Sequence, residues 1–304
     1  MKKLFLIFIL ILTGCNNYND IKNLAIINEI AIDYNKQYII QIKVLSNDQE
    51  NKDQIYKETC ISINECFNNL NNKLSKKIYL THLELLIISD SINQKQFKEI
   101  FNFFLQEQSS RNNFAIIGIN NINNNILRVN SKDIINMLDL SINSNGIVKK
   151  ISFEEIIKDI LNFNLSYIPY IDSSKKEIIG YLQIYDNTKK LSKEESIALN
   201  FIFNNTKSIT LFINNKTYKI ENCNTTITPK DNLNINISCN YQGIKKEKEI
   251  IENYINNIIK MFIINNKNNY FNYLKEKYNI NKDKEIIINT KISLIKTNTG
   301  DSFE

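Results

Sequence analysis

The sequence predicts an α+β protein, a body of mixed or antiparallel sheets flanked by helices. Three Ser-x-x-Glu segments, at Ser62, Ser152 and Ser192, have the spacing of capping boxes, and each precedes apolar residues at helical intervals. Between them lie segments that alternate or are continuously apolar, as strands do. The 304 residues are 43% hydrophobic, which is enough for a packed core, and they suit two small domains or three compact ones.

The N-terminal half alternates between strands and helices. The polar segment 33–36 precedes an alternating run with Ile40, Ile42 and Val44 on one face, so we expect a hairpin turn there. Residues 83–88 are apolar on both faces, as in a central buried strand. In chain order we expect strands over 24–33, 38–45, 78–88 and 114–119, and helices over 62–74, 97–104 and 131–138, the last capped by Ser131.

The polar segment 172–177 is the best candidate for a domain boundary. Before it we expect a helix over 152–161 and extended chain over 167–171. After it we expect strands over 178–185, 208–213, 217–227, 233–239 and 286–295, and helices over 192–203 and 251–262. This division gives an N-terminal α+β region of two subdomains over 24–171 and a C-terminal domain over 178–304.

The first fifteen residues predict export and lipidation. Lys2 and Lys3 precede an apolar run over 4–12, which matches a secretory signal and is shorter than the ~20 residues of a membrane-spanning helix. The following Thr13-Gly14-Cys15 looks like a bacterial lipobox. We therefore expect a signal peptide over 1–14, cleavage after Gly14, and a lipidated tether over 15–23 that begins at Cys15 and binds the membrane. The alternatives are an ordinary signal peptide and an uncut signal anchor.

Four more cysteines follow in a compartment that permits disulfides. Cys223 and Cys239 are equidistant from Asp231, and a hairpin centred there would place them opposite each other, within reach of a cross-strand disulfide. The alternative is two free thiols. Cys60 and Cys66 flank a helix start without sharing a helical face, so we expect both to be free. The sequence contains no Cys-x-x-Cys, so nothing supports a zinc site.

The candidate chemical residues point away from catalysis. His82 is the single histidine, which cannot build a multi-histidine metal site, and the six scattered glycines form no phosphate-binding loop. A catalytic base would need a nucleophile, and the sequence beside His82 offers only Thr81, so we expect a structural residue at a strand start. The acid pairs 154–155 and 194–195 fall in first helical turns, where negative charge is favourable.

We therefore expect no catalytic residue, no metal and no cofactor, and no pattern marks a ligand-binding residue. Loss of Lys2 and Lys3 with the signal peptide lowers the formal net charge from +6 to +4. The exported chain is then only mildly basic, so we expect no nucleic-acid partner.

Four segments in this order resemble the Ger(x)C family, the lipoprotein C subunits of the nutrient germinant receptors of bacterial spores. The first, 15–33, contains Leu24-Ala25-Ile26-Ile27, with Asn16-Asn17 in place of the family's Trp-Asp, and with Glu29 and Ala31 where the family has glycine. The others are 76–88, with Thr81 at a glycine position, then 151–169, which resembles the middle helix and extended proline segment, and 180–196, which resembles the opening of the C-terminal domain.

The resemblance covers nearly the whole chain after Cys15 and implies a function in spore germination. It implies a three-domain α+β body on the outer face of the spore inner, or cytoplasmic, membrane, with 178–304 as the C-terminal germination-protein domain. There the chain would assemble with the integral membrane A and B subunits of a receptor that triggers germination. The resemblance also implies that the chain is not an enzyme.

Two other classes of function remain open at this point. An extracytoplasmic solute-binding lipoprotein of a transporter would bind a small solute tightly in its isolated body. A cell-envelope enzyme would need a catalytic constellation, and hydrolase activity that is lost in His82→Ala would support it.

Overall fold

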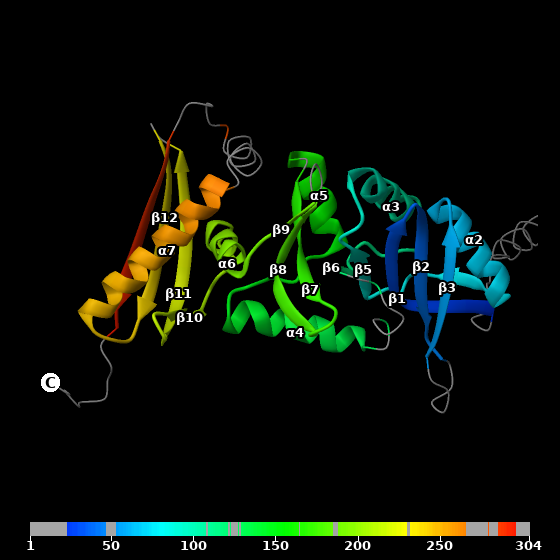
Figure 1. The fold of residues 1–304 in the computed structure, drawn as a ribbon, viewed down its shortest axis with the longest axis horizontal. Coiled ribbons are helices and arrows are strands. Elements are labelled where there is room, and N and C mark those ends of the chain that lie inside the picture. The colour runs from blue at the N-terminus through cyan, green and yellow to red at the C-terminus, as the bar shows by residue number, and fades with distance from the viewer. Residues whose placement is uncertain are drawn as a thin grey trace, which may run out of the picture.

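In the computed structural model, two β-sheets and their helices form the body of the chain (Figure 1). The structure describes residues 23–46, 53–107, 109–120, 122, 127, 129–163, 165–184, 188–229, 232–265, 279 and 285–295. The strands are β1 Leu24–Asn35, β2 Gln37–Val44, β3 Gln54–Cys60, β4 Lys77–Tyr79, β5 Leu85–Ser89, β6 Ala115–Ile119, β7 Ser166–Asp172, β8 Glu177–Ile184, β9 Lys189–Lys190, β10 Ile209–Ile213, β11 Lys216–Pro229, β12 Leu233–Tyr241 and β13 Ile286–Leu294. The helices are α2 Ile63–Leu74, α3 Gln94–Gln106, α4 Ser131–Ser144, α5 Phe153–Phe163, α6 Lys193–Ile202 and α7 Lys245–Asn265.

The first sheet has nine strands in the order β3-β2-β1-β5-β6-β7-β8-β9, and β4 also pairs with β1. The central strands β1, β5, β6 and β7 are parallel, while the strands toward both edges are antiparallel. The sequence predicts mixed or antiparallel sheets, and this sheet is mixed, with a parallel centre. A parallel pair needs a crossover connection, and the helices between β5 and β7 supply it.

Helices cover both faces of this sheet, because neighbouring residues of its buried strands point to opposite sides. Leu86 and Ile88 of β5 belong to the apolar cluster with α2, α3 and α5. Leu85 and Ile87 of the same strand belong to the cluster with α4 and α6. The expected central strand over 83–88 is thus buried on both faces, as predicted, although its regular part begins at Leu85.

The second sheet has four strands in sequence order, β10-β11-β12-β13, with β12 and β13 parallel. Helix α7 lies across one face, and its buried side chains Ile251, Ile255, Ile258, Ile259 and Phe262 repeat at helical intervals. In Figure 1 this sheet lies at one end of the long axis, and β1–β3 with α2 lie at the other end. The mixed α+β architecture with two sheets confirms the predicted fold class.

One apolar cluster runs without a break from the first sheet into the second. It contains Ile117 of β6, Leu199 of α6 and Ile235 of β12. The buried Asn200 of α6 lies within this junction. Its Nδ2 donates to the carbonyls of Gly146 and Ile147 at 2.7 and 2.9 Å, and its Oδ1 accepts from Tyr181 Oη at 2.8 Å and Asn205 Nδ2 at 3.3 Å. All four hydrogen-bonding positions of this amide are therefore occupied.

The three helix starts predicted from capping boxes are confirmed, since α2, α5 and α6 follow Ser62, Ser152 and Ser192 directly. Other predictions differ in detail. The first hairpin turns at Lys36, which has φ 62°, because the pairing of β1 with β2 continues to Asn35 and Gln37. The expected strand over 78–88 is interrupted after Tyr79 by a turn at 81–82, and β4 and β5 pair with different parts of β1.

Two further differences concern polar residues. Asn130, and not Ser131, caps α4, because its side chain accepts from the backbone N–H of Lys132 at 3.1 Å. The segment 172–177 is the hairpin turn between β7 and β8, which pair in one sheet. The chain passes from the first sheet to the second only after β9, through α6.

We predict that Asn200→Ala lowers the free energy of unfolding by at least ~3 kcal/mol, because it leaves Tyr181 Oη and two buried carbonyls without their partner. Chemical denaturation monitored by circular dichroism checks this. The matched control is Asn143→Ala, since the exposed Asn143 bonds only to a carbonyl of its own helix. Equal stabilities of the two variants would contradict the prediction.

Candidate functional site

The predicted lipidation residue, Cys15, lies outside the described residues, as do the signal peptide 1–14 and the tether up to residue 22. The first described residue, Asn23, leads directly into β1. Among the described helices, none is long and apolar enough to cross a bilayer.

His82 lies in the exposed turn between β4 and β5, with its ring centroid 6.5 Å from that of Tyr79. The sequence predicts that His82 stands at a strand start. In the structure it lies in the turn before β5 and not in the strand. The imidazole makes no hydrogen bond or ion pair with another described residue. Nothing in its described surroundings would activate it as a base.

The two acid pairs serve helix starts. Glu155 accepts from the backbone N–H of Ser152 at 2.8 Å and from Lys149 Nζ at 3.1 Å. Burial opposes its charge, but these bonds outweigh burial and lower the pKa of the Glu155 carboxyl. Glu195 closes the same reciprocal cap with Ser192. Within the described ranges, no three His, Cys, Asp or Glu residues are grouped so as to hold a metal ion.

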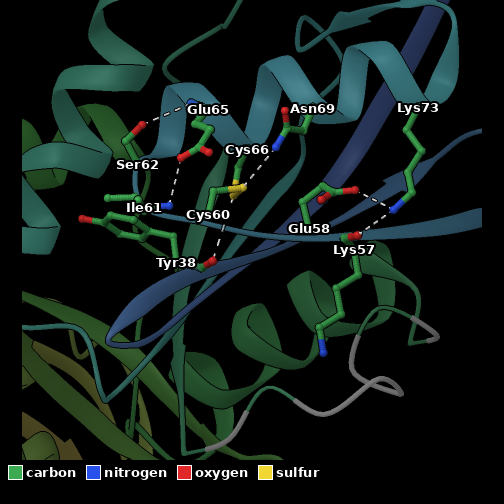
Figure 2. Close-up of a disulfide and its surroundings, with 10 residues drawn as sticks. All are labelled: Tyr38, Lys57, Glu58, Cys60, Ile61, Ser62, Glu65, Cys66, Asn69 and Lys73. Atoms are coloured by element: carbon green, nitrogen blue, oxygen red, sulfur yellow. Dashed lines mark hydrogen bonds and ion pairs between the residues drawn. A yellow bond between two sulfur atoms is a disulfide. The ribbon is translucent and has the colours of Figure 1, made fainter.

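The structure joins Cys60 and Cys66 in a disulfide, so the prediction of two free thiols is wrong (Figure 2). Cys60 ends β3 and Cys66 lies in the first turn of α2, with Cα atoms 5.4 Å apart. The helical-face argument fails because only one of the two residues is helical. A cysteine that ends a strand, followed by a tight turn into a helix, is the sequence signal for this bridge.

Polar contacts on both sides support this disulfide (Figure 2). The Ser62 hydroxyl accepts from the backbone N–H of Glu65 at 3.3 Å, while the Glu65 carboxylate accepts from the N–H of Ile61 at 3.0 Å. Further along α2, Lys73 pairs with Glu58 of β3 at 2.5 Å. The helix is therefore joined to the edge strand β3 at both of its ends.

The second pair, Cys223 and Cys239, lies on β11 and β12 beneath α7, with Cα atoms 4.1 Å apart and a disulfide between them. The pairing of Ile227 with Ile235 centres this hairpin on Asp231, which itself lies outside the described residues. A bulge between Glu221 and Asn224 turns Cys223 toward the core.

A buried ion pair occupies the first glycine position of the resemblance. Glu29 Oε1 lies 2.9 Å from Lys43 Nζ across β1 and β2, and accepts from the backbone N–H of Ser131 at 2.8 Å. Ser131 Oγ in turn donates to Glu84 at 2.5 Å. Burial raises the pKa of the Glu29 carboxyl, and the bonds from Lys43 and Ser131 offset part of that shift. Glu29 thus fixes the start of α4, where a carboxylate is favourable.

Polar residues gather where the parallel strands end, which is the usual ligand site of such sheets. Asp90 follows β5 and accepts from Tyr170 Oη of β7, and it pairs with Lys190 of β9, each at 2.6 Å. Burial and the bond to Asp90 raise the pKa of Tyr170 to about 12. These contacts fasten β5, β7 and β9 together, so the network is structural.

A cavity of about 280 Å³ lies between α5, α6 and the strands β7 and β8. Tyr167 and Tyr181 line it, and Lys149, Glu155 and Lys158 stand at its polar part. Both lysines are paired, Lys149 with Glu155 and Lys158 with Glu154 at 2.7 Å.

With two mixed sheets flanked by helices and two buried disulfides, the chain is an α+β protein. A family model described as the spore germination protein N-terminal domain matches residues 17–173, slightly more than half of the chain. A solved structure, reported as the crystal structure of the GerBC protein, has the same fold with a TM-score of 0.51 at 14% identity. The match covers 88% of this chain and 97% of that one. No curated protein matches. The chain therefore belongs to the Ger(x)C family of spore germination proteins.

We predict that all four body cysteines are oxidised. The exported chain with Cys15→Ala, unfolded without reductant, should take up no alkylating reagent, as measured by mass spectrometry. Replacing Cys60 and Cys66 by Ser should cost about 2 kcal/mol of unfolding free energy, and replacing Cys223 and Cys239 about 3, because the second bridge closes the longer loop. Labelling of either pair would count against that bridge.

We predict that Glu29→Ala lowers the unfolding free energy by about 3–5 kcal/mol, because it leaves the buried Lys43 ammonium without its main partner. Adding Lys43→Met should recover most of this loss in a denaturation titration. If the double variant is no more stable than Glu29→Ala, then the lost stability comes from the bond to Ser131 and not from the unpaired charge of Lys43.

Proposed function

We propose that this chain is the lipid-anchored subunit of a nutrient-sensing spore germinant receptor. The observation that carries the proposal is the match to the germination family, which begins at residue 17, two residues after the lipobox cysteine Cys15. In this proposal the body assembles with the integral membrane A and B subunits, and nutrient binding to the assembly triggers germination.

Two features support the proposed compartment. A diacylated Cys15 would hold the body at the outer face of the spore inner, or cytoplasmic, membrane, since two acyl chains suffice for stable attachment. The two disulfides support the same side, because disulfides persist in oxidising compartments.

The proposed action is assembly and not chemistry. The acid pairs that could have served as catalytic carboxylates accept hydrogen bonds at helix starts, as Glu155 and Glu195 show. The exposed His82 stands apart from them, in a turn at the amino end of β5.

We predict that spores of a deletion strain fail to release dipicolinic acid on nutrient challenge. Wild-type complementation should restore release, and Cys15→Ala should restore it at least several-fold less, because the unanchored body is diluted away from the membrane. Immunoblots must show equal amounts of the two chains. Full release in the deletion strain, with sister receptors also deleted, would refute the receptor function, and full activity of Cys15→Ala would refute the anchor.

The cavity between α5 and α6 favours a second candidate, a solute-binding lipoprotein that serves a transporter. Calorimetry of the isolated body against small solutes separates the two, because the transporter function requires tight binding and the receptor-subunit function expects little or none.

A further inference from the structure

The parallel strands of the first sheet share one edge at which they begin, the amino edge. Leu24 opens β1 and pairs with Lys77, the first residue of β4. The turn at 81–82 leads into β5, and the segment 109–114 leads into β6. Thr81 Oγ1 donates to the carbonyl of Ser109 at 2.8 Å, so these approaches lie side by side.

Cations at this edge outnumber anions. Lys76, Lys77, Arg111 and Lys132 are exposed, and the side-chain charge of each makes no ion pair or hydrogen bond with another described residue. Among the described residues, three acids lie nearby, and all are already engaged. Glu154, whose backbone N–H donates to the carbonyl of Asn112, pairs with Lys158 at 2.7 Å. Glu84 accepts from Ser131 Oγ at 2.5 Å, and Glu107 accepts from Ser109 Oγ at 2.7 Å. The edge at which the strands end carries both signs, with Asp33, Asp90 and Asp172 at the ends of β1, β5 and β7, and Lys175 and Lys176 in the turn after β7.

A cavity of about 360 Å³ opens beside the basic residues of the amino edge. Its lining includes the side chains of Lys132, Lys150, Asn113 and Asn136, together with Leu83 and Glu84. Lys150 is paired with Asp139 at 3.4 Å, while Lys132 has no such partner among the described residues. Ammonium and amide donors in a concave site suit a phosphate group.

The chain length between anchor and body limits how far this edge can stand from a membrane. Nine residue steps separate Cys15 from Leu24, which span at most about 32 Å when fully extended. Since charges act over only about 8 Å at physiological salt, the edge must approach lipid closely to be attracted. A lipid on Cys15 would keep the amino edge within reach of the membrane, so that the edge can approach the lipid surface.

We propose that the amino edge, with Lys76, Lys77, Arg111, Lys132 and the adjoining cavity, is a docking surface for an anionic phospholipid bilayer. Docking through this surface turns the amino edge of the sheet toward the membrane and the opposite edge away from the membrane. The proposal rests on the lipid anchor of the proposed function only for the distance limit. The docking itself is a property of the body.

The test measures vesicle binding of the full exported chain carrying Cys15→Ala, so that no lipid contributes. Cosedimentation should show binding to phosphatidylcholine vesicles with about one third phosphatidylglycerol, weakened by salt, and little binding to phosphatidylcholine alone. Lys76→Gln with Lys77→Gln should lower the partition coefficient about thirty-fold, and Lys132→Gln about five-fold. The matched control, Lys175→Gln with Lys176→Gln, removes the same charge from the opposite edge and should change it less than two-fold.

Three outcomes would overturn the proposal: no binding to the anionic vesicles, equal binding to both vesicle types, or an equal loss in the control pair. Inorganic phosphate at constant ionic strength should leave vesicle binding unchanged, and displacement by it would mean that the cavity takes free phosphate and not the bilayer. Circular dichroism melts of all variants exclude misfolding. Failure of vesicle binding leaves the dipicolinic acid assay untouched, so the two proposals fail separately.

Discussion

The amide of Asn200 fixes helix α6, which connects the two sheets along the chain, against the first sheet. Three parts of the chain meet there, the segment at Gly146 and Ile147, strand β8 through Tyr181, and helix α6 itself. An apolar cluster alone would allow α6 to slide against the first sheet, because apolar contacts have little directionality. A buried amide with every donor and acceptor engaged permits one arrangement, since any shift would leave a polar group unpaired.

The features that could be predicted from sequence are the local ones. Ser62, Ser152 and Ser192 mark helix starts because a cap is satisfied within four residues. The disulfide geometry of Cys223 and Cys239 was open to sequence reasoning only because a short hairpin makes their pairing local. Strand β3 depends instead on its pairing with β2, and the break between β4 and β5 depends on which part of β1 each strand joins; both are decided across the sheet.

Glu29 shows how a residue that looks misplaced in sequence can be accommodated in the core. A carboxylate at a family glycine position would be costly in an apolar interior. Here Lys43 stands across the strand pair, and the start of α4 presents the backbone N–H of Ser131. Lys43 is 14 residues from Glu29 across the β1–β2 hairpin, but Ser131 lies 102 residues away. Composition and periodicity therefore carry no sign of them, and the structure was needed to find them.

The parallel pairing of β12 and β13 has a consequence for the order of events when the protein is made. Asn236 and Asn289 are neighbours in the sheet, yet 53 residues separate them along the chain. A polypeptide that folds as it emerges can close the β10–β11–β12 meander early, but β12 keeps one bare edge until α7 has crossed the sheet. An unpaired strand edge is a template for pairing with other chains. Folding of this protein thus includes an interval of exposure to aggregation, which ends only when β13 pairs with β12.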